Sequence, residues 1–107
     1  MTEFARRRET FESKYVHDEA LRFKAIARRN KLLGLWAAER LGKTGTEAEA
    51  YAGAVVAADF EEPGDADVIR KVIGDLRAAS VSADEDDVRR VLSDLLVVAT
   101  AEINAGM

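Results

Sequence analysis

Apolar residues recur at helical spacing in four stretches of the chain, and polar residues separate these stretches. Repeats at i, i+3, i+4 and i+7 indicate amphipathic helices that each bury one face. The second half of the first stretch is apolar nearly all round, so it should lie at the centre of the molecule. We therefore predict helices over residues 18–41, 46–60, 65–79 and 82–104.

The inner face of each helix is expected to carry its periodic apolar residues. In chain order these are Phe23, Ile26, Ala27, Leu33, Ala37 and Leu41, then Ala48, Tyr51, Ala52, Val55 and Val56, then Ile69, Val72, Ile73 and Leu76, and finally Val88, Val91, Leu92, Leu95, Val98, Ala99 and Ile103. Leu21, Ala25, Leu32, Leu35 and Trp36 widen the apolar surface of the first helix.

Residues that begin and end helices lie between these stretches. We expect a C-cap at Gly42, capping boxes at Thr46 with Glu49 and at Ser82 with Glu85, and an N-cap at Asp65. Gly74 lies inside the third predicted helix, where it costs about 1 kcal/mol relative to Ala. We therefore expect Gly74 to mark a close contact with another helix.

A chain of 107 residues with 48% apolar and 34% charged residues is sized for one domain and one core. The absence of cysteine excludes disulfides and thiolate chemistry. Four helices with short connections predict an all-α, four-helix bundle-like domain, either up-and-down or an irregular relative. No apolar run is longer than that of residues 95–99, which is too short to cross a membrane, so direct membrane insertion is not expected.

Residues 1–17 differ from the rest and are predicted to form a flexible basic arm on a four-helix domain, residues 18–107. Phe4, Phe11 and Tyr15 are spaced by seven and four, so they would share one face of a helix. Arg6, Arg7, Arg8 and Lys14 lie among them. An isolated helix this short is marginal in water, so the arm should become helical only in a partner's groove.

Charge is distributed unevenly along the chain. Residues 1–31 hold nine Lys/Arg against five Asp/Glu, whereas residues 32–107 hold seven against fifteen. A basic arm on an acidic body favours an acidic partner surface for the arm. Nucleic acid is not the expected partner, because no nucleic-acid module is present.

Catalytic and metal chemistry find little support in the sequence. His17 is the only histidine and has no second group with which to form a catalytic set. The acidic residues between 59 and 67 do not follow the spacing of a calcium loop. We predict neither a catalytic nor a metal site, and therefore not an enzyme.

Four cations of the first predicted helix form a basic stripe: Lys24, Arg28, Arg29 and Lys31. The simpler interpretation is a solvated outer face, and the functional one is an anion site. The stripe lacks the Gly-rich turn of a phosphate cradle, so only weak ADP or ATP binding is expected. A small nucleotide-binding regulatory or sensor protein is therefore the alternative function, and no tightly bound cofactor is predicted.

Three blocks carry a family resemblance: RETFESKYVHDEALRFKA at residues 8–25, ARRNKLLGLWAAERLG at 27–42 and DFEEPGDADVIRKVIGDL at 59–76. Together they closely resemble the alphaproteobacterial zeta subunit, the inhibitor of the rotary ATP synthase. The resemblance implies a cytoplasmic protein, peripheral to the inner membrane through the synthase, whose N-terminal segment inserts as a helix between catalytic subunits near the central rotor. Hydrolysis would be blocked and synthesis left comparatively free.

Some positions depart from the pattern of that family. Ala5 and Arg6 stand where acidic residues are common, and Tyr15 and Val16 replace Phe and Ala. Ser80 stands where Gly is frequent between the third and fourth helices.

Overall fold

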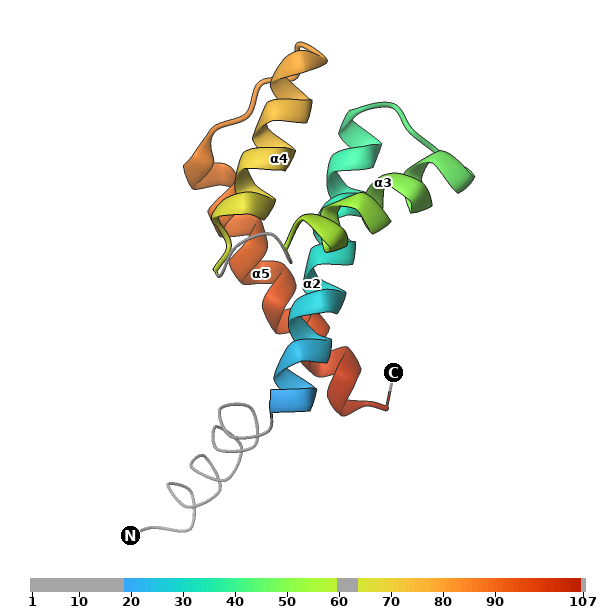
Figure 1. Cartoon of the computed structure of the whole chain (residues 1–107), viewed down its shortest axis with the longest axis vertical. Coiled ribbons are helices and arrows are strands. Elements are labelled where there is room, and N and C mark those ends of the chain that lie inside the picture. The colour runs from blue at the N-terminus through green and yellow to red at the C-terminus, as the bar shows by residue number, and fades with distance from the viewer. Residues whose placement is uncertain (1–18, 60–63, 107) are drawn as a thin grey trace, which may run out of the picture.

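The computed structural model describes residues 19–59 and 64–106, and every regular element in them is a helix. The helices are α2 (Glu19–Arg40), α3 (Gly45–Ala58), α4 (Ala66–Ala78) and α5 (Glu85–Asn104) (Figure 1). The predicted all-α class and the four predicted helical stretches are confirmed.

Helix α2 lies at the centre of the molecule, as its apolar second half predicts. Helices α3 and α5 both pack on α2 but not on each other, since no Cα atom of α3 lies within 8 Å of a Cα atom of α5. Helix α4 contacts the other three helices. Helix α5 crosses α2, so that its C-terminal end lies near the first turns of α2 (Figure 1). The arrangement is therefore the irregular relative of an up-and-down bundle.

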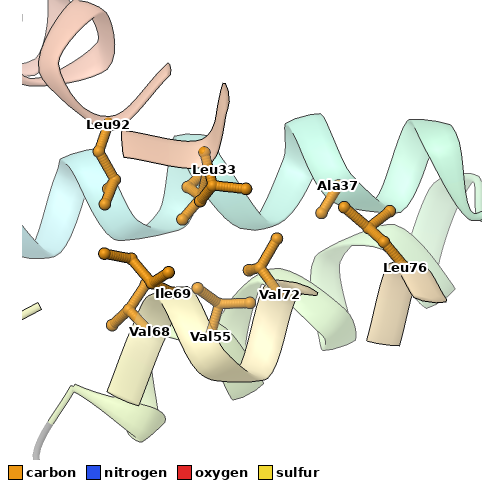
Figure 2. Packing of buried hydrophobic residues seen from close by; sticks show 9 residues of the cluster. Leu33, Ala37, Val55, Val68, Ile69, Val72, Leu76 and Leu92 are labelled. Carbon is orange, nitrogen blue, oxygen red and sulfur yellow. The ribbon is translucent and has the colours of Figure 1, made fainter. Parts of the chain in front are cut away.

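The hydrophobic core lies where all four described helices meet (Figure 2). Its buried members are Leu33, Ala37, Val55, Val68, Ile69, Val72, Leu76, Val88 and Leu92. All but Val68 are among the predicted inner-face residues. Ala25 and Ala99 are also buried, but they lie outside this cluster, on the parts of α2 and α5 that extend beyond it.

Two residues of the predicted inner face are in fact exposed. Phe23 is 57% exposed and Val98 is 45% exposed, so these two predictions are wrong. The physical reason is that Phe23 precedes the core on α2 and Val98 follows it on α5. In that region the core cluster does not surround the helices, so helical spacing alone does not bury every apolar residue.

The close helix contact is made by Gly34 and not by Gly74. A Cβ atom built on Gly34 would lie 2.6 Å from the Cα of Ala52, whereas one on Gly74 would meet no atom within 4 Å. Gly34 therefore lets α2 and α3 approach backbone to backbone, and the prediction for Gly74 is wrong. Gly74 lies on an exposed face of α4.

Helices α2 and α4 end in the same hydrogen-bonded motif. After α2, Gly42 has a φ of 76°, and the Lys43 N–H donates to the Ala38 carbonyl at 2.9 Å. After α4, Ser80 has a φ of 61°, and the Val81 N–H donates to the Leu76 carbonyl at 2.8 Å. Both are Schellman motifs, which favour glycine at the left-handed position. Gly42 is confirmed as a helix-ending residue, and the left-handed backbone explains why Gly is expected where Ser80 stands.

The two predicted capping boxes are wrong. Thr44 is the N-cap of α3, two residues before Thr46, and its side chain makes no capping hydrogen bond. Asp84 is the N-cap of α5, and its carboxylate accepts a hydrogen bond from the Asp87 N–H at 2.9 Å. An aspartate next to the helix start is at least as good an N-cap as a serine, so Asp84 takes this position in place of Ser82.

A polar contact joins α3 to α4 beside the core. The Tyr51 hydroxyl donates to the Asp75 carboxylate at 2.8 Å, and the Lys71 ammonium donates to the same carboxylate oxygen at 3.1 Å. Burial, followed by the hydrogen bond to Asp75 and its negative charge, raises the pKa of Tyr51 well above its ordinary value. Tyr51 is therefore a neutral hydrogen-bond donor at physiological pH.

Candidate functional site

The predicted arm residues lie outside the residues that the structure describes. This holds for Phe4, Arg6, Arg7, Arg8, Phe11, Lys14 and Tyr15, and also for His17. Their roles stay predictions.

Three of the four cations in the basic stripe of α2 pair with carboxylates, each from a different neighbouring element. Arg28 forms an ion pair with Glu102 of α5, and Lys31 lies 3.7 Å from the Glu49 carboxylate of α3. Arg29 pairs with Asp65 at the start of α4. Lys24 is exposed. Helical spacing places these cations near one another in sequence, but three of them point to carboxylates of their own chain.

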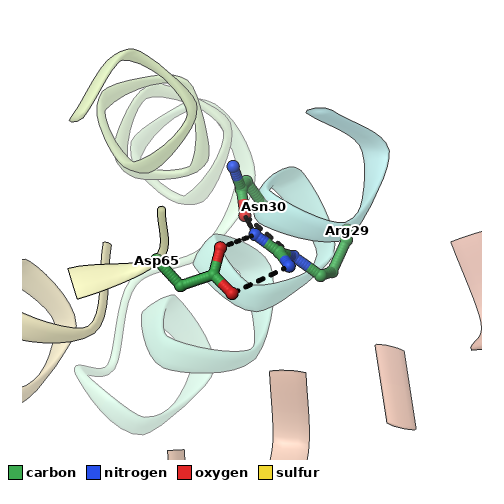
Figure 3. A network of polar contacts seen from close by, with 3 residues as sticks. All are labelled: Arg29, Asn30 and Asp65. Carbon is green, nitrogen blue, oxygen red and sulfur yellow. Dashed lines mark hydrogen bonds and ion pairs between the residues drawn. The ribbon is translucent and has the colours of Figure 1, made fainter. Parts of the chain in front are cut away.

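Arg29 is a buried cation at the centre of a polar network that includes the buried Asn30 and the partly exposed Asp65 (Figure 3). Its side chain is 5% exposed, and its guanidinium donates to the Asp65 carboxylate through Nη2 at 2.8 Å and Nη1 at 3.4 Å. It also donates to Oδ1 of Asn30 through Nε at 3.1 Å and Nη2 at 2.8 Å. A buried cation needs such partners, because an unpaired charge in the interior is costly.

Asp65 therefore has a different function from the predicted one. It does occupy the N-cap position of α4, but its side chain makes no capping hydrogen bond. The carboxylate turns instead to Arg29, thirty-six residues earlier in the chain. The network joins α2 to the start of α4 and thereby holds the first turn of α4 in place against α2.

Replacing Asp65 by Ala should destabilise the fold by about 1–3 kcal/mol, the usual cost of losing hydrogen bonds to a charged group. Arg29 stays buried in the variant and keeps only Asn30 as a partner. Urea unfolding followed by circular dichroism measures the change. Arg89→Ala is the matched control, because the Arg89–Glu85 pair is exposed on both sides and should contribute about 0.5 kcal/mol or less. Equal effects of the two substitutions would contradict the importance of the buried network.

The ion pairs of the basic stripe reduce its capacity to bind an anion at the predicted site. A phosphate at Arg28 or Arg29 would have to compete with Glu102 or Asp65. The side chains also leave α2 toward different helices and do not converge on one point. Binding of ADP or ATP to this stripe stays a prediction.

An open groove runs between the N-terminal half of α2 and the C-terminal half of α5. It has a volume of about 940 Å³. Leu96 and Val97 of α5 line it and are 37% and 70% exposed. The other lining residues are Arg22, Ala25, Ile26, Arg29, Asp65, Thr100, Ala101 and Asn104. We refer to this feature as the α2/α5 groove.

Sequence reasoning did not find the groove, although a signal was present. Residues 95–99 are apolar at five successive positions, and a single helix face cannot bury all of them. Some of these side chains therefore have to face away from the core. Which ones do so depends on where α5 crosses α2, which the sequence pattern does not specify.

No metal-binding or membrane-spanning feature emerges from the part of the chain that the structure describes. Residues 19–59 and 64–106 contain no group of three or more histidine or acidic side chains arranged to hold a metal ion. No helix among them is long and apolar enough to cross a bilayer.

Comparison with known proteins identifies the family. A family model described as ATPase inhibitor subunit zeta matches residues 1–102. The chain belongs to this family. The resemblance seen in the three sequence blocks is thereby confirmed, and the zeta family is a family of inhibitor subunits and not of catalysts.

A solved structure has a fold similar to that of this chain. A solution NMR structure is similar to this chain with 53% sequence identity and a TM-score of 0.71. The match covers 81% of this chain and 99% of the other. No curated protein matches the chain.

Proposed function

We propose that this zeta-family chain inhibits ATP hydrolysis by the rotary ATP synthase. Residues 1–17 insert as a helix between catalytic subunits near the central rotor, and residues 18–107 anchor the protein. The observation that carries the proposal is the family match, which includes the N-terminal residues as well as the helical body. The protein then acts in the cytoplasm, peripheral to the inner membrane through its partner.

The residues of the arm suit insertion into a protein groove. Ordering a segment costs on the order of 1–2 kcal/mol per residue for the backbone alone, so the bound arm must recover this free energy from its contacts. Phe4, Phe11 and Tyr15 supply one apolar face for burial. Arg6, Arg7 and Arg8 supply charge for carboxylates on the synthase, which also speeds association.

The body suits an anchoring function. Its core unites four helices, and the Arg29 network fixes the start of α4 against α2. Such a body keeps one shape while the arm is inserted. We further propose that the hydrolytic rotation of the rotor closes the catalytic interface onto the arm, whereas the synthetic rotation opens it.

The test uses the cognate synthase. A tagged full-length chain should retain the catalytic subunits from solubilised native membranes, and adding the purified chain should lower ATP hydrolysis more than ATP synthesis. Hydrolysis and synthesis use the same catalytic subunits with opposite directions of rotation, so measuring both on one preparation of sealed membrane vesicles separates directional inhibition from a general loss of activity. Failure to retain the catalytic subunits, together with unchanged hydrolysis at saturating chain, would refute the proposal.

A further inference from the structure

The α2/α5 groove is a mainly apolar surface that the described helices leave open, and its lining also includes the charged residues Arg22, Arg29 and Asp65. Its volume of about 940 Å³ lies at the upper end of the range for sites that bind small molecules, so it can hold more than one aromatic ring. Val97 is 70% exposed in it, although a valine gains free energy from burial. The groove therefore has the shape and chemistry to receive an apolar helix face.

The chain itself provides the nearest occupant. Residues 1–17 join α2 just before Glu19, and Arg22 in the first turn of α2 already lines the groove. A segment held by so short a connection has an effective concentration on the order of millimolar. A separate partner has to reach a comparable concentration or affinity before it can compete.

The spacing of the aromatic residues matches the length of the groove. On α2 the lining residues extend from Arg22 to Arg29, about 10 Å along the helix axis. Phe4 and Phe11 are seven residues apart, so in a helix their side chains are about 10 Å apart on one face. Residues 12–18 then form the reversal, and their number is within the usual range for a connection between two packed helices.

We propose that the arm docks in the α2/α5 groove when the protein is free, with residues 1–11 as a helix whose Phe4 and Phe11 lie against Ile26, Leu96 and Val97. The docked helix runs antiparallel to α2. The contact is weak and reversible, because two rings on an open surface recover only part of the free energy of ordering the segment.

Docking would regulate inhibition, a consequence that rests on the function proposed above. A docked arm is not available to the synthase, so the apparent affinity of the protein for the synthase is reduced by the fraction of molecules whose arm is undocked. The groove thereby sets how much of the protein is ready to inhibit.

Docking can be measured on the full-length chain without the synthase. The natural chain lacks cysteine, so Ser13→Cys gives a single attachment site for a nitroxide spin label. We expect the label to broaden the methyl signals of Leu96 and Val97 strongly, and to leave those of Val81, in the connection between α4 and α5, unchanged. Adding Phe4→Ser and Phe11→Ser to the labelled chain should restore the signals. Undiminished signals of Leu96 and Val97 would overturn the proposal.

A second copy is the competing occupant, and mixing distinguishes it. Spin-labelled chain at natural isotope abundance is mixed with unlabelled, isotope-enriched chain. Broadening in the enriched chain would mean that the arm docks between molecules, and this result would overturn the proposal. Docking within one molecule is supported if the signals broaden when one chain carries both the spin label and the isotopes, and do not broaden in the mixture.

Two neighbouring substitutions on α5 separate the groove from general effects. Val97→Asp should release the arm, whereas Val98→Asp should not, because Val98 is exposed but does not line the groove. If the function proposed above is correct, Val97→Asp lowers the concentration needed for half-inhibition. The expected factor is one divided by the fraction of natural chains whose arm is undocked. If the Leu96 and Val97 signals broaden but Val97→Asp does not inhibit at lower concentration, the regulatory consequence alone is overturned. If no full-length variant inhibits, the result counts instead against the proposed function.

Discussion

Removal of residues 1–17 should abolish inhibition of ATP hydrolysis and leave the melting of the helical body cooperative. The core cluster and the Arg29 network lie entirely within residues 29–92, so the truncated chain keeps all of their contacts. It loses Phe4, Phe11 and Tyr15, the three rings of the proposed inserted face. Hydrolysis by the cognate synthase measures the first effect, and thermal unfolding by circular dichroism measures the second.

Full-length variants determine which property of the arm is responsible. Replacing the three rings by Ser preserves the length and charge of the arm and should remove most of the inhibition. Replacing Arg6, Arg7 and Arg8 by Gln preserves the rings and should mainly slow association, with an effect that shrinks at high salt. A truncated chain that inhibits as strongly as the whole would disprove the proposed insertion of the arm.

The substitution Gly34→Ala should destabilise the fold by about 1–3 kcal/mol, the usual cost of overpacking a close contact. The new Cβ would lie 2.6 Å from the Cα of Ala52, so α2 and α3 would have to move apart. For a domain of this size, each kcal/mol corresponds to about 4–8 °C in Tm. Urea and thermal unfolding measure the loss.

Gly74→Ala is the matched control for Gly34→Ala. Gly74 also lies inside a helix, and a Cβ on it would meet no atom within 4 Å. This substitution should therefore stabilise the protein by up to about 1 kcal/mol through helix propensity. A stabilising effect of Gly34→Ala would show that the two helices pack less closely than the structure indicates.

The existence of the helices could be predicted from the sequence, but the identity of the packed glycine could not. Apolar periodicity is a local signal, and it located all four stretches. The cost of a helical glycine is also local, and it is the same for Gly34 and Gly74. What distinguishes the two glycines is whether another helix packs on them. Helix α3 packs on α2 at Gly34, whereas no described helix packs on α4 at Gly74. That position depends on tertiary packing.

The candidate site shows the same division between local and distant information. The stripe of Lys24, Arg28, Arg29 and Lys31 could be seen from helical spacing. The pairing of Arg29 with Asp65 joins residues far apart in the chain, and Asp65 already had a sufficient local explanation as an N-cap. The sequence therefore drew attention to Arg29 and Asp65, but it indicated neither the contact between them nor the part of Asn30 in the network.

The placement of small side chains beyond the core has a mechanical consequence. In the parts of α2 and α5 that extend beyond the core cluster near the first turns of α2, the buried hydrophobic residues are Ala25 and Ala99, and each removes little apolar area from water. These two alanines therefore contribute little free energy against a change in the crossing angle of the two segments, whereas the other end of the molecule is held by leucine, isoleucine and valine. We therefore expect the crossing of α2 and α5 to deform more easily at the first turns of α2 than where four helices meet, so that a partner binding at these turns would tilt them while the core keeps its packing.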